Sequence, residues 1–222
     1  MNGRLASVVI LGLLTLGAAT ASAELIVNGD LEAHGTLTGG GGTNQSFPFG
    51  SGYVDNWASS GSSGRYYTNV GALSGVAVMN TWGVYSYFYQ ENIAVTAGTE
   101  YTLSAMIKPT STLWPENVGA LIEVVWFAEG VAPTMANYAS RISRVTAVNY
   151  VPDATKWNQW QPMQGSIVAP ENAAGCMVLV GNKTASGWTS AYFDNVSMVP
   201  EPTTMGIACI GGAMTLLRRR NR

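Results

Sequence analysis

Short stretches of alternating hydrophobic and polar residues fill the centre of the chain, separated by glycine, proline, asparagine and serine. Between residues 100 and 109, for example, Tyr101, Leu103, Ala105 and Ile107 fall on one side. A side-chain period of two residues is typical of a strand with one buried face. This pattern predicts strands at 75–80, 85–95, 100–109, 119–130, 141–150, 157–170, 175–181 and 188–199.

No central stretch has the period of an amphipathic helix, so the pattern predicts an all-β fold. Many short strands separated by turn residues favour an antiparallel β-sandwich of the jelly-roll type. The segments 36–52 and 59–64 are rich in glycine and serine and are predicted to be flexible loops. Residues 24–198 are numerous enough for one domain with its own core.

The N-terminal end is a short basic segment followed by an apolar one. Arg4 precedes an almost wholly apolar run, and small residues stand at Ala21 and Ala23. This order is that of a secretory signal peptide, which signal peptidase would remove after residue 23. A retained membrane anchor is the alternative.

The C-terminal end, "VPEPTTMGIACIGGAMTLLRRRNR", has a second apolar run at 205–217. As a helix this run would reach about 20 Å, at about 1.5 Å per residue. A hydrocarbon core is about 30 Å thick, so the run predicts only a transient membrane contact. Arginines at its end favour the cytoplasmic side.

These C-terminal features resemble the PEP-CTERM sorting signal of Gram-negative bacteria. The motif residues are Pro200, Glu201, Pro202 and the arginine cluster Arg218, Arg219 and Arg220. The resemblance covers 199–222 and implies cleavage by an exosortase-type membrane protease. It also implies a location in the outer envelope, on the cell surface or in the extracellular matrix. A proline-rich linker before a structural helix is the alternative.

Charge excludes one class of partner. The whole chain has a net charge of −2, and five of its eleven basic residues lie in the two apolar ends. Residues 24–202 keep six basic against thirteen acidic residues, a net charge of −7. Such a domain is not expected to bind nucleic acid.

The central domain resembles galactose-binding-like jelly rolls, the fold of several families of carbohydrate-binding modules. The matching segments are "ELIVNGDLE" at 24–32, "QENIAVTAGTEYTLSAMIKP" at 90–109, "WNQWQPMQGSIVAP" at 157–170 and "AYFDNVSM" at 191–198. Leu31 stands where an aromatic residue is usual, and a glycine-rich insertion follows His34. The resemblance implies a non-catalytic module that binds polysaccharide.

Aromatic side chains are the candidates for contact with a glycan, because a flat ring covers the apolar face of a pyranose. Trp82 and Trp114 lie beside predicted turns, and Tyr85 begins a row with Tyr87 and Tyr89 at every second position. On the strand 119–130 we expect Trp126 on the core side and Glu123 and Phe127 on the opposite side. The predicted glycan contacts are Trp82, Tyr85, Trp114, Glu123 and Phe127.

A structural calcium ion is a further expectation. The motifs near the two ends of the domain carry Glu32 and Asp194, and first and last strands of a jelly roll commonly lie side by side. Carboxylates that meet there would favour an oxygen-liganded cation. The resemblance implies the same ion, with the backbone of Asp30 as a further ligand. The alternative is that Asp194 only accepts hydrogen bonds from a turn.

Two other functions stay open at this stage. A hydrolase has little support, since the chain has one histidine, His34, and no Gly-x-Ser-x-Gly motif. A glycosidase would need two carboxyl groups about 5–10 Å apart, and cross-strand pairs remain possible. The other alternative is a purely structural envelope or biofilm protein with no small ligand.

Overall fold

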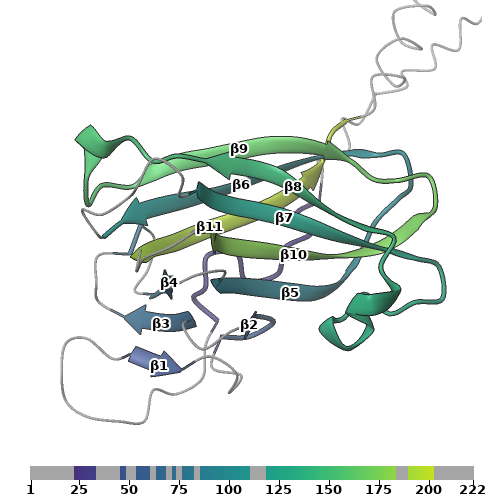
Figure 1. Cartoon of the computed structure of the whole chain (residues 1–222), viewed down its shortest axis with the longest axis horizontal. Helices are drawn as coiled ribbons and strands as arrows, with labels where there is room; N and C mark the ends of the chain where they lie inside the picture. The colour runs from purple at the N-terminus through teal and green to yellow at the C-terminus, as the bar shows by residue number, and fades with distance from the viewer. Residues whose placement is uncertain are drawn as a thin grey trace, which may run out of the picture. The chain divides into compact units, whose positions relative to one another are not determined.

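The computed structural model describes residues 23–33, 46–48, 54–60, 64–68, 72–73, 77–82, 86–110, 119–183 and 190–202. Within them the protein is an antiparallel β-sandwich, which confirms the predicted fold class (Figure 1). One sheet has the strand order β1–β3–β4–β11–β6–β9, with bounds Ser46–Pro48, Gly64–Thr68, Ala77–Trp82, Ser190–Pro200, Glu100–Pro109 and Gln161–Val168. The other has the order β2–β5–β10–β7–β8, with bounds Ala58–Ser60, Ser86–Ala94, Ala173–Lys183, Gly119–Ala128 and Ser143–Tyr150.

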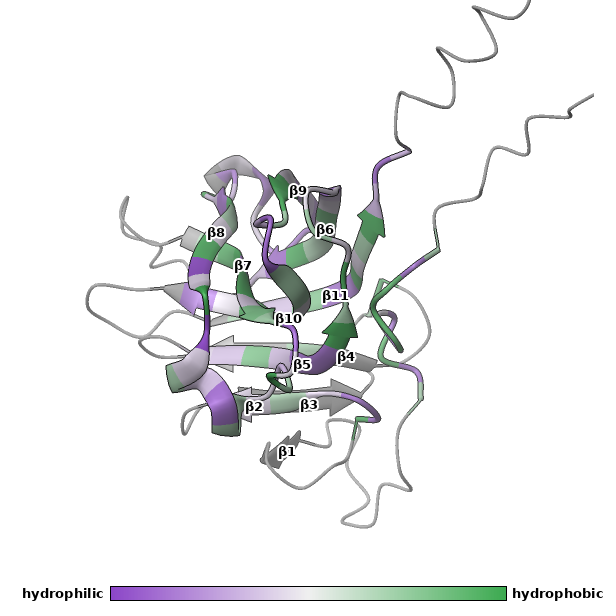
Figure 2. Ribbon diagram, turned by 90° about the vertical axis from the view of Figure 1, so that its right-hand side faces the viewer, coloured by the Kyte–Doolittle hydropathy of each residue, from purple (hydrophilic) through white to green (hydrophobic). Residues whose placement is uncertain are grey.

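Alternation along the strands builds the core between the two sheets. In β6 the residues Tyr101, Leu103, Ala105 and Ile107 are all buried, as the sequence predicts. Trp126 of β7 is fully buried, which confirms its predicted place in the core. Its ring lies 6.4 Å from that of Tyr101, so the two sheets contact each other through aromatic side chains. Figure 2 shows hydrophobic residues along strands of both sheets.

The opening motif lies beside the last strand. The N–H of Leu25 donates to the carbonyl of Met198, and the N–H of Val196 donates to the carbonyl of Gly29. The carboxylate of Glu24 accepts hydrogen bonds from the N–H of Met198 and the hydroxyl of Ser197. The two ends of the domain therefore lie side by side, as expected from the sequence.

The structure differs from the predicted elements mainly at the glycine-rich segments. Strands β1, β2 and β3 were not predicted, because they are short and lie in or beside sequence of loop composition. Two short 3-10 helices, η1 (Met135–Ser140) and η2 (Ala154–Lys156), connect strands. No helix among the described residues is long and apolar enough to cross a membrane.

The last strand runs beyond the predicted end of the domain. Strand β11 continues to Pro200, and the N–H of Glu201 donates to the carbonyl of Glu100. The compact unit spans Ser22–Glu201. The first part of the Pro-Glu-Pro motif is therefore held by the sandwich, whereas 203–222 and 1–22 lie outside the described residues.

Candidate glycan-binding site

Strand β5 presents polar and aromatic side chains on the outer side of the five-stranded sheet. Phe88 belongs to the main core, so its neighbours Tyr87 and Tyr89 project to the other side. Tyr87 is buried and Tyr89 is half-buried. Burial, followed by the charge of Glu91, raises the pKa of Tyr89, so this phenol stays protonated at neutral pH. The row of rings predicted from the sequence is thus present for its two described members.

A charged pair crosses the neighbouring strands on the same side. Glu123 of β7 pairs in register with Thr146 of β8, and Arg144 lies two residues before it. The Arg144 guanidinium donates to the Glu123 carboxylate through Nε at 3.1 Å and through a second nitrogen. It also donates to the Tyr138 hydroxyl at 3.0 Å and lies 5.0 Å from the centre of the Tyr87 ring.

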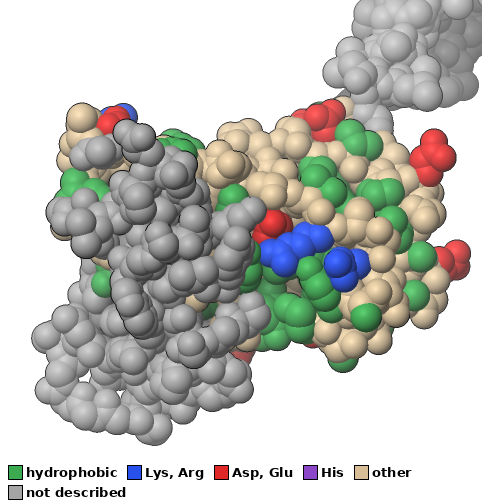
Figure 3. Space-filling model, viewed as in Figure 1, with side chains coloured by type: hydrophobic (Ala, Val, Ile, Leu, Met, Phe, Trp, Pro, Cys, Tyr) green, Lys and Arg blue, Asp and Glu red, His purple; other side chains and the backbone are tan. Residues whose placement is uncertain are grey.

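The ionisation of Arg144 follows from these contacts. Burial acts to lower its pKa, but the hydrogen bonds to Glu123 and Tyr138 and the negative charge of Glu123 together raise it. Arg144 therefore remains a cation on this face. We call Tyr87, Tyr89, Glu123, Tyr138 and Arg144 the tyrosine face. Figure 3 shows basic side chains next to an acidic one, with hydrophobic side chains around them.

An apolar cluster on the same side of the sheet packs against the tyrosine face. Tyr87, Val125, Phe127, Met177 and Leu179 are buried together on the outer side of the sheet. The segment around η1 covers part of them, since Val131, Met135 and Tyr138 pack against the cluster. A separate hydrophobic core on the outside of a sheet needs such a cover to keep it from water.

Two predicted contact residues can be placed on this side of the sheet. Glu123 and Phe127 both project away from the main core, as expected from the alternation along β7. Phe127 has no exposed surface, and Glu123 is 6% exposed and paired with Arg144. In this conformation neither side chain offers a free flat surface to a sugar. Their role in binding stays a prediction.

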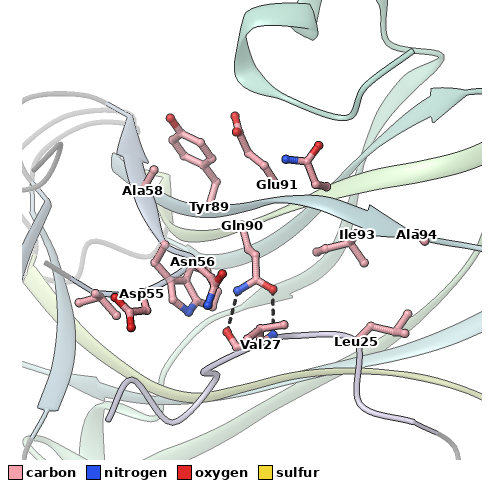
Figure 4. Close-up of a pocket in the computed structure, with 13 residues that line it drawn as sticks. Leu25, Val27, Asp55, Asn56, Ala58, Tyr89, Gln90, Glu91, Ile93 and Ala94 are labelled. Carbon is pink, nitrogen blue, oxygen red and sulfur yellow. Dashed lines mark hydrogen bonds between the residues drawn. The ribbon is translucent and has the colours of Figure 1, made fainter. Parts of the chain in front are cut away.

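A pocket opens at the edge of the tyrosine face, beside β5 (Figure 4). Its volume is about 620 Å³. Its lining combines the N-terminal segment, the turn before β2 and the second half of β5, and includes Leu25, Val27, Asp55, Asn56, Trp57, Tyr89, Glu91, Asn92 and Ile93. Because Tyr89 and Glu91 lie on the outer side of β5, the pocket and the tyrosine face are continuous.

A β-bulge in β5 shapes the polar side of the pocket. Ile93 pairs with Cys176 and Gln90 with Val178, so Glu91 and Asn92 together oppose a single residue of β10. Such an extra residue redirects side chains and is over-represented near functional sites. Asn92 has a φ of 60°, and Asn56, which also lines the pocket, has a φ of 68°. Asparagine tolerates this left-handed region better than most residues.

The N-terminal segment is fixed as one wall of the pocket. Figure 4 shows Gln90 reaching from β5 to Val27, where its amide makes two hydrogen bonds to the backbone, of 2.8 Å and 2.7 Å. The Trp57 indole N–H donates to the carbonyl of Asn28 at 3.0 Å. The Asn28 side chain donates to the carbonyls of Ala33 and Asp55 and accepts from the N–H of Ala33. Asn28 of the Asn-Gly opening motif therefore joins the N-terminal segment to the turn before β2.

The three predicted metal ligands differ in their exposure to solvent. Among the described residues, no group of three or more His, Cys, Asp and Glu side chains is arranged to hold a metal ion. Asp30 is exposed and Glu32 is half-buried. Asp194 is fully buried, and its carboxylate accepts hydrogen bonds from the N–H groups of Leu73 at 3.0 Å and Asn195 at 2.7 Å. A calcium ion held by the carboxylates of Glu32 and Asp194 and by the backbone of Asp30 stays a prediction.

Several other predicted site residues are not described by the structure, or only their backbone is described. Tyr85, Trp114 and the arginine cluster Arg218, Arg219 and Arg220 are not among the described residues. Trp82 is in β4 opposite Ser190 of β11, and its side chain is likewise outside the description. The exposed residues Glu201 and Pro202 follow β11 directly.

Sequence reasoning missed Asp55, Glu91 and Arg144. Arg144 carried a usable signal, because it lies on a predicted strand next to the one that bears Glu123. The pocket carried none, since it joins three segments that are distant in the sequence and depends on a bulge in β5.

Comparisons with known proteins give the fold but no family. No family model and no curated protein sequence match the chain. A cyclase from Fischerella sp. TAU, in complex with 4-(1H-indol-3-yl)butan-2-one, has a TM-score of 0.53 at 12% identity, covering 82% of this chain and 98% of that one. This likeness shows that the two chains share a fold.

Carbohydrate-binding modules are also among the similar structures. A xylan-binding domain of module family 22 has a TM-score of 0.46 at 14% identity, covering 70% of this chain and 94% of that one. Modules CBM22-1 and GH10 of xylanase 10B from Clostridium thermocellum, complexed with xylohexaose, have a TM-score of 0.48 at 15% sequence identity. That match covers 66% of this chain but only 26% of the xylanase chain, about a quarter of its length.

Proposed function

We propose that this protein is an exported, non-catalytic polysaccharide-binding protein. The glycan would bind at the tyrosine face and in the adjoining pocket. The observation that carries the proposal is the continuity of the two: Tyr89 belongs to both, and Glu91 of the pocket projects from the same side of β5. A glycan could thus extend along the face while one sugar unit enters the pocket.

The chemistry of the pocket suits a sugar. Its volume of about 620 Å³ lies within the range of about 300–1,000 Å³ that is common for small-ligand pockets. The carboxylates of Asp55 and Glu91 can accept hydrogen bonds from hydroxyl groups, and asparagine amides can both donate and accept them. The half-buried Tyr89 ring supplies an apolar surface for stacking. Trp82, Tyr85 and Trp114 remain predicted glycan contacts in addition to these residues.

Binding to immobilised polysaccharides tests the proposal. We expect Tyr89→Ala to weaken binding about tenfold, because a stacking contact contributes about 1 kcal/mol or slightly more. Asp55→Asn should weaken it as well. Glu171→Gln, which changes an exposed carboxylate outside the pocket, serves as the matched control and should bind like wild type. Unchanged affinity in both pocket variants would overturn this site, and binding to no glycan at all would favour the purely structural alternative.

A glycoside-active enzyme is a second candidate, favoured by one observation. Asp55 and Glu91 line the same pocket, and glycosidases use two carboxyl groups, one as acid and one as base or nucleophile. One Glu91 oxygen already accepts the N–H of Met135 at 2.5 Å, which restricts its orientation. Hydrolysis of any glycoside in a broad screen, lost in Glu91→Gln and Asp55→Asn, would establish this alternative over simple binding.

We also propose the cellular route implied by the sequence. Signal peptidase would remove 1–23, the segment 205–217 would contact the membrane transiently, and an exosortase-type protease would act on the C-terminal signal. The protein would then reach the outer envelope, the cell surface or the matrix.

A structural calcium ion remains a proposal that rests on the resemblance and on the carboxylates of Glu32 and Asp194. Glu32 and the buried Asp194 would each supply a ligand, and backbone carbonyls, that of Asp30 among them, would supply the others. Calcium accepts such oxygen ligands readily.

A further inference from the structure

A second group of aromatic side chains lies on the opposite sheet, around one lysine. Lys108 of β6 pairs in register with Tyr192 of β11. Its ammonium nitrogen lies 5.8 Å from the centre of the Tyr192 ring and 5.7 Å from that of Trp160, which directly precedes β9. We call Lys108, Trp160 and Tyr192 the lysine platform.

The lysine platform faces away from the core. Ile107 and Phe193, the neighbours of Lys108 and Tyr192 along their strands, are both fully buried between the sheets. Because side chains alternate along a strand, Lys108 and Tyr192 project to the outside. Both rings of the platform are half-buried, so each keeps part of its surface exposed.

The chemistry of the platform favours an anionic partner with an apolar face. Lys108 is one of only six basic residues between the two apolar ends of the chain. Burial lowers the pKa of Lys108. A carboxylate or sulfate group could pair with the ammonium group, while the two rings could stack against sugar units.

We propose that the lysine platform is a second glycan-binding site, specific for an acidic polysaccharide. An anionic chain needs a local cation here, because the domain as a whole carries a net charge of −7. Lys108 would bind the acidic group, and Trp160 and Tyr192 would stack on adjacent sugars. The ligand class rests on the proposed function, but the site itself does not, since it shares no residue with the pocket or the tyrosine face.

The two sites lie on the outer sides of different sheets. Tyr89 and Glu123 project from the five-stranded sheet, whereas Lys108 and Tyr192 project from the six-stranded one. A polymer bound to one sheet therefore leaves the other sheet accessible. One molecule can bridge two polysaccharide chains, which is the property required of a cross-linking protein of an extracellular matrix.

Affinity measurements on alginate, a polyuronate, and on a neutral β-glucan test the platform. We expect Lys108→Met to weaken alginate binding about fivefold to tenfold and to reduce its salt dependence, because one charge pair is lost. Lys108→Arg should retain most of the affinity, and Trp160→Ala should reduce it. Lys156→Met, which changes an exposed lysine paired with Asp153, is the matched control. Circular dichroism establishes that each variant is folded.

The outcomes separate this site from the proposed pocket. If Lys108→Met and Trp160→Ala bind alginate like wild type, the second site is overturned, whatever happens at Tyr89. If they lose alginate while Tyr89→Ala binds every glycan normally, the platform stands and the pocket proposal fails. Wild type should also sediment a mixture of the two polysaccharides as a mixed complex, and either Lys108→Met or Tyr89→Ala should reduce the amount that sediments. An undiminished mixed complex in both variants contradicts bridging.

Discussion

Gly29 shows how one residue of the opening motif is required by packing. A Cβ atom at this position would lie 1.9 Å from the carbonyl oxygen of Val196, well inside contact distance. The close approach exists because the N-terminal segment lies against β11 and bonds to it at Val196. Asn28 precedes it with a φ of 55° and holds Ala33 and Asp55 through its amide. Backbone geometry thus explains why asparagine and glycine occupy positions 28 and 29.

We expect Gly29→Ala to lower the free energy of unfolding by about 3 kcal/mol, because the backbone of β11 or of the opening segment must move. Gly98→Ala is the matched control. It has no atom within 4 Å of the new Cβ but a φ of 71°, so backbone strain alone should cost about 1 kcal/mol. Urea denaturation measures both. Equal losses in the two variants would show that the contact with Val196 is not limiting.

Asp194 is the residue on which the calcium proposal depends. If calcium binds, the melting temperature of the chain 24–202 should be higher in calcium than in EDTA. The free energy of unfolding should rise by about 2.7 kcal/mol when free calcium is a hundredfold above Kd. Asp194→Asn should remove the difference, while Asp30→Asn, at an exposed position, should reduce it only if Asp30 is a ligand through its side chain. A melting temperature that is the same in calcium and EDTA for wild type rules out the ion.

At the scale of elements, β7 and β8 are joined by a charged pair that packs against aromatic rings. Glu123 is 6% exposed, while the Arg144 side chain keeps 29% of its surface exposed. Removal of one partner from such a pair leaves the other charge poorly hydrated. The pair also ties the outer cluster to η1, because Arg144 donates to Tyr138.

We expect Arg144→Met alone to destabilise the protein by about 2 kcal/mol, because the Glu123 carboxylate would lose its cation. The double variant Glu123→Leu/Arg144→Met should lose much less than the sum of the two single variants. A double-mutant cycle by urea denaturation measures this coupling. If the single losses add, the pair contributes nothing beyond its separate side chains.

At the scale of the whole molecule, the proposed export route depends on the two ends of the chain. The sandwich extends to Glu201, whose N–H is bonded to Glu100. A protease that acts on the C-terminal signal must therefore cut beyond this anchored residue, or release Glu201 from the sandwich first. The described structure thus places a physical limit on the position of the cut.

Mass spectrometry of envelope and secreted fractions tests this route. The mature protein should begin near Glu24 and end close after Glu201, without peptides from 205–217. Replacement of Arg218, Arg219 and Arg220 by serine should retain the tail, because the positively charged stop would be lost. Peptides that contain 206–218 in the mature wild-type protein would contradict the cutting step.

The sequence by itself determined strands β4 to β11, the buried faces among them and the fold class. Alternation with a period of two is a local property, and it placed Tyr101, Leu103, Ala105, Ile107 and Trp126 in the core. It also placed Glu123 and Phe127 on the side away from that core. Local patterning suffices for these features because burial of one strand face requires no knowledge of which strand lies next to it.

Only the tertiary structure decided what those faces contact. Strand order brought Arg144 to Glu123, and a bulge in β5 brought Glu91 to a pocket shared with Asp55. Register brought Tyr192 beside Lys108. Met135 and Tyr138 of η1, which has no strong sequence signal, pack against the outer apolar cluster. Each of these depends on contacts between distant segments, and a pattern of hydrophobic and polar residues carries no information about pairing, bulges or the packing of a connecting segment.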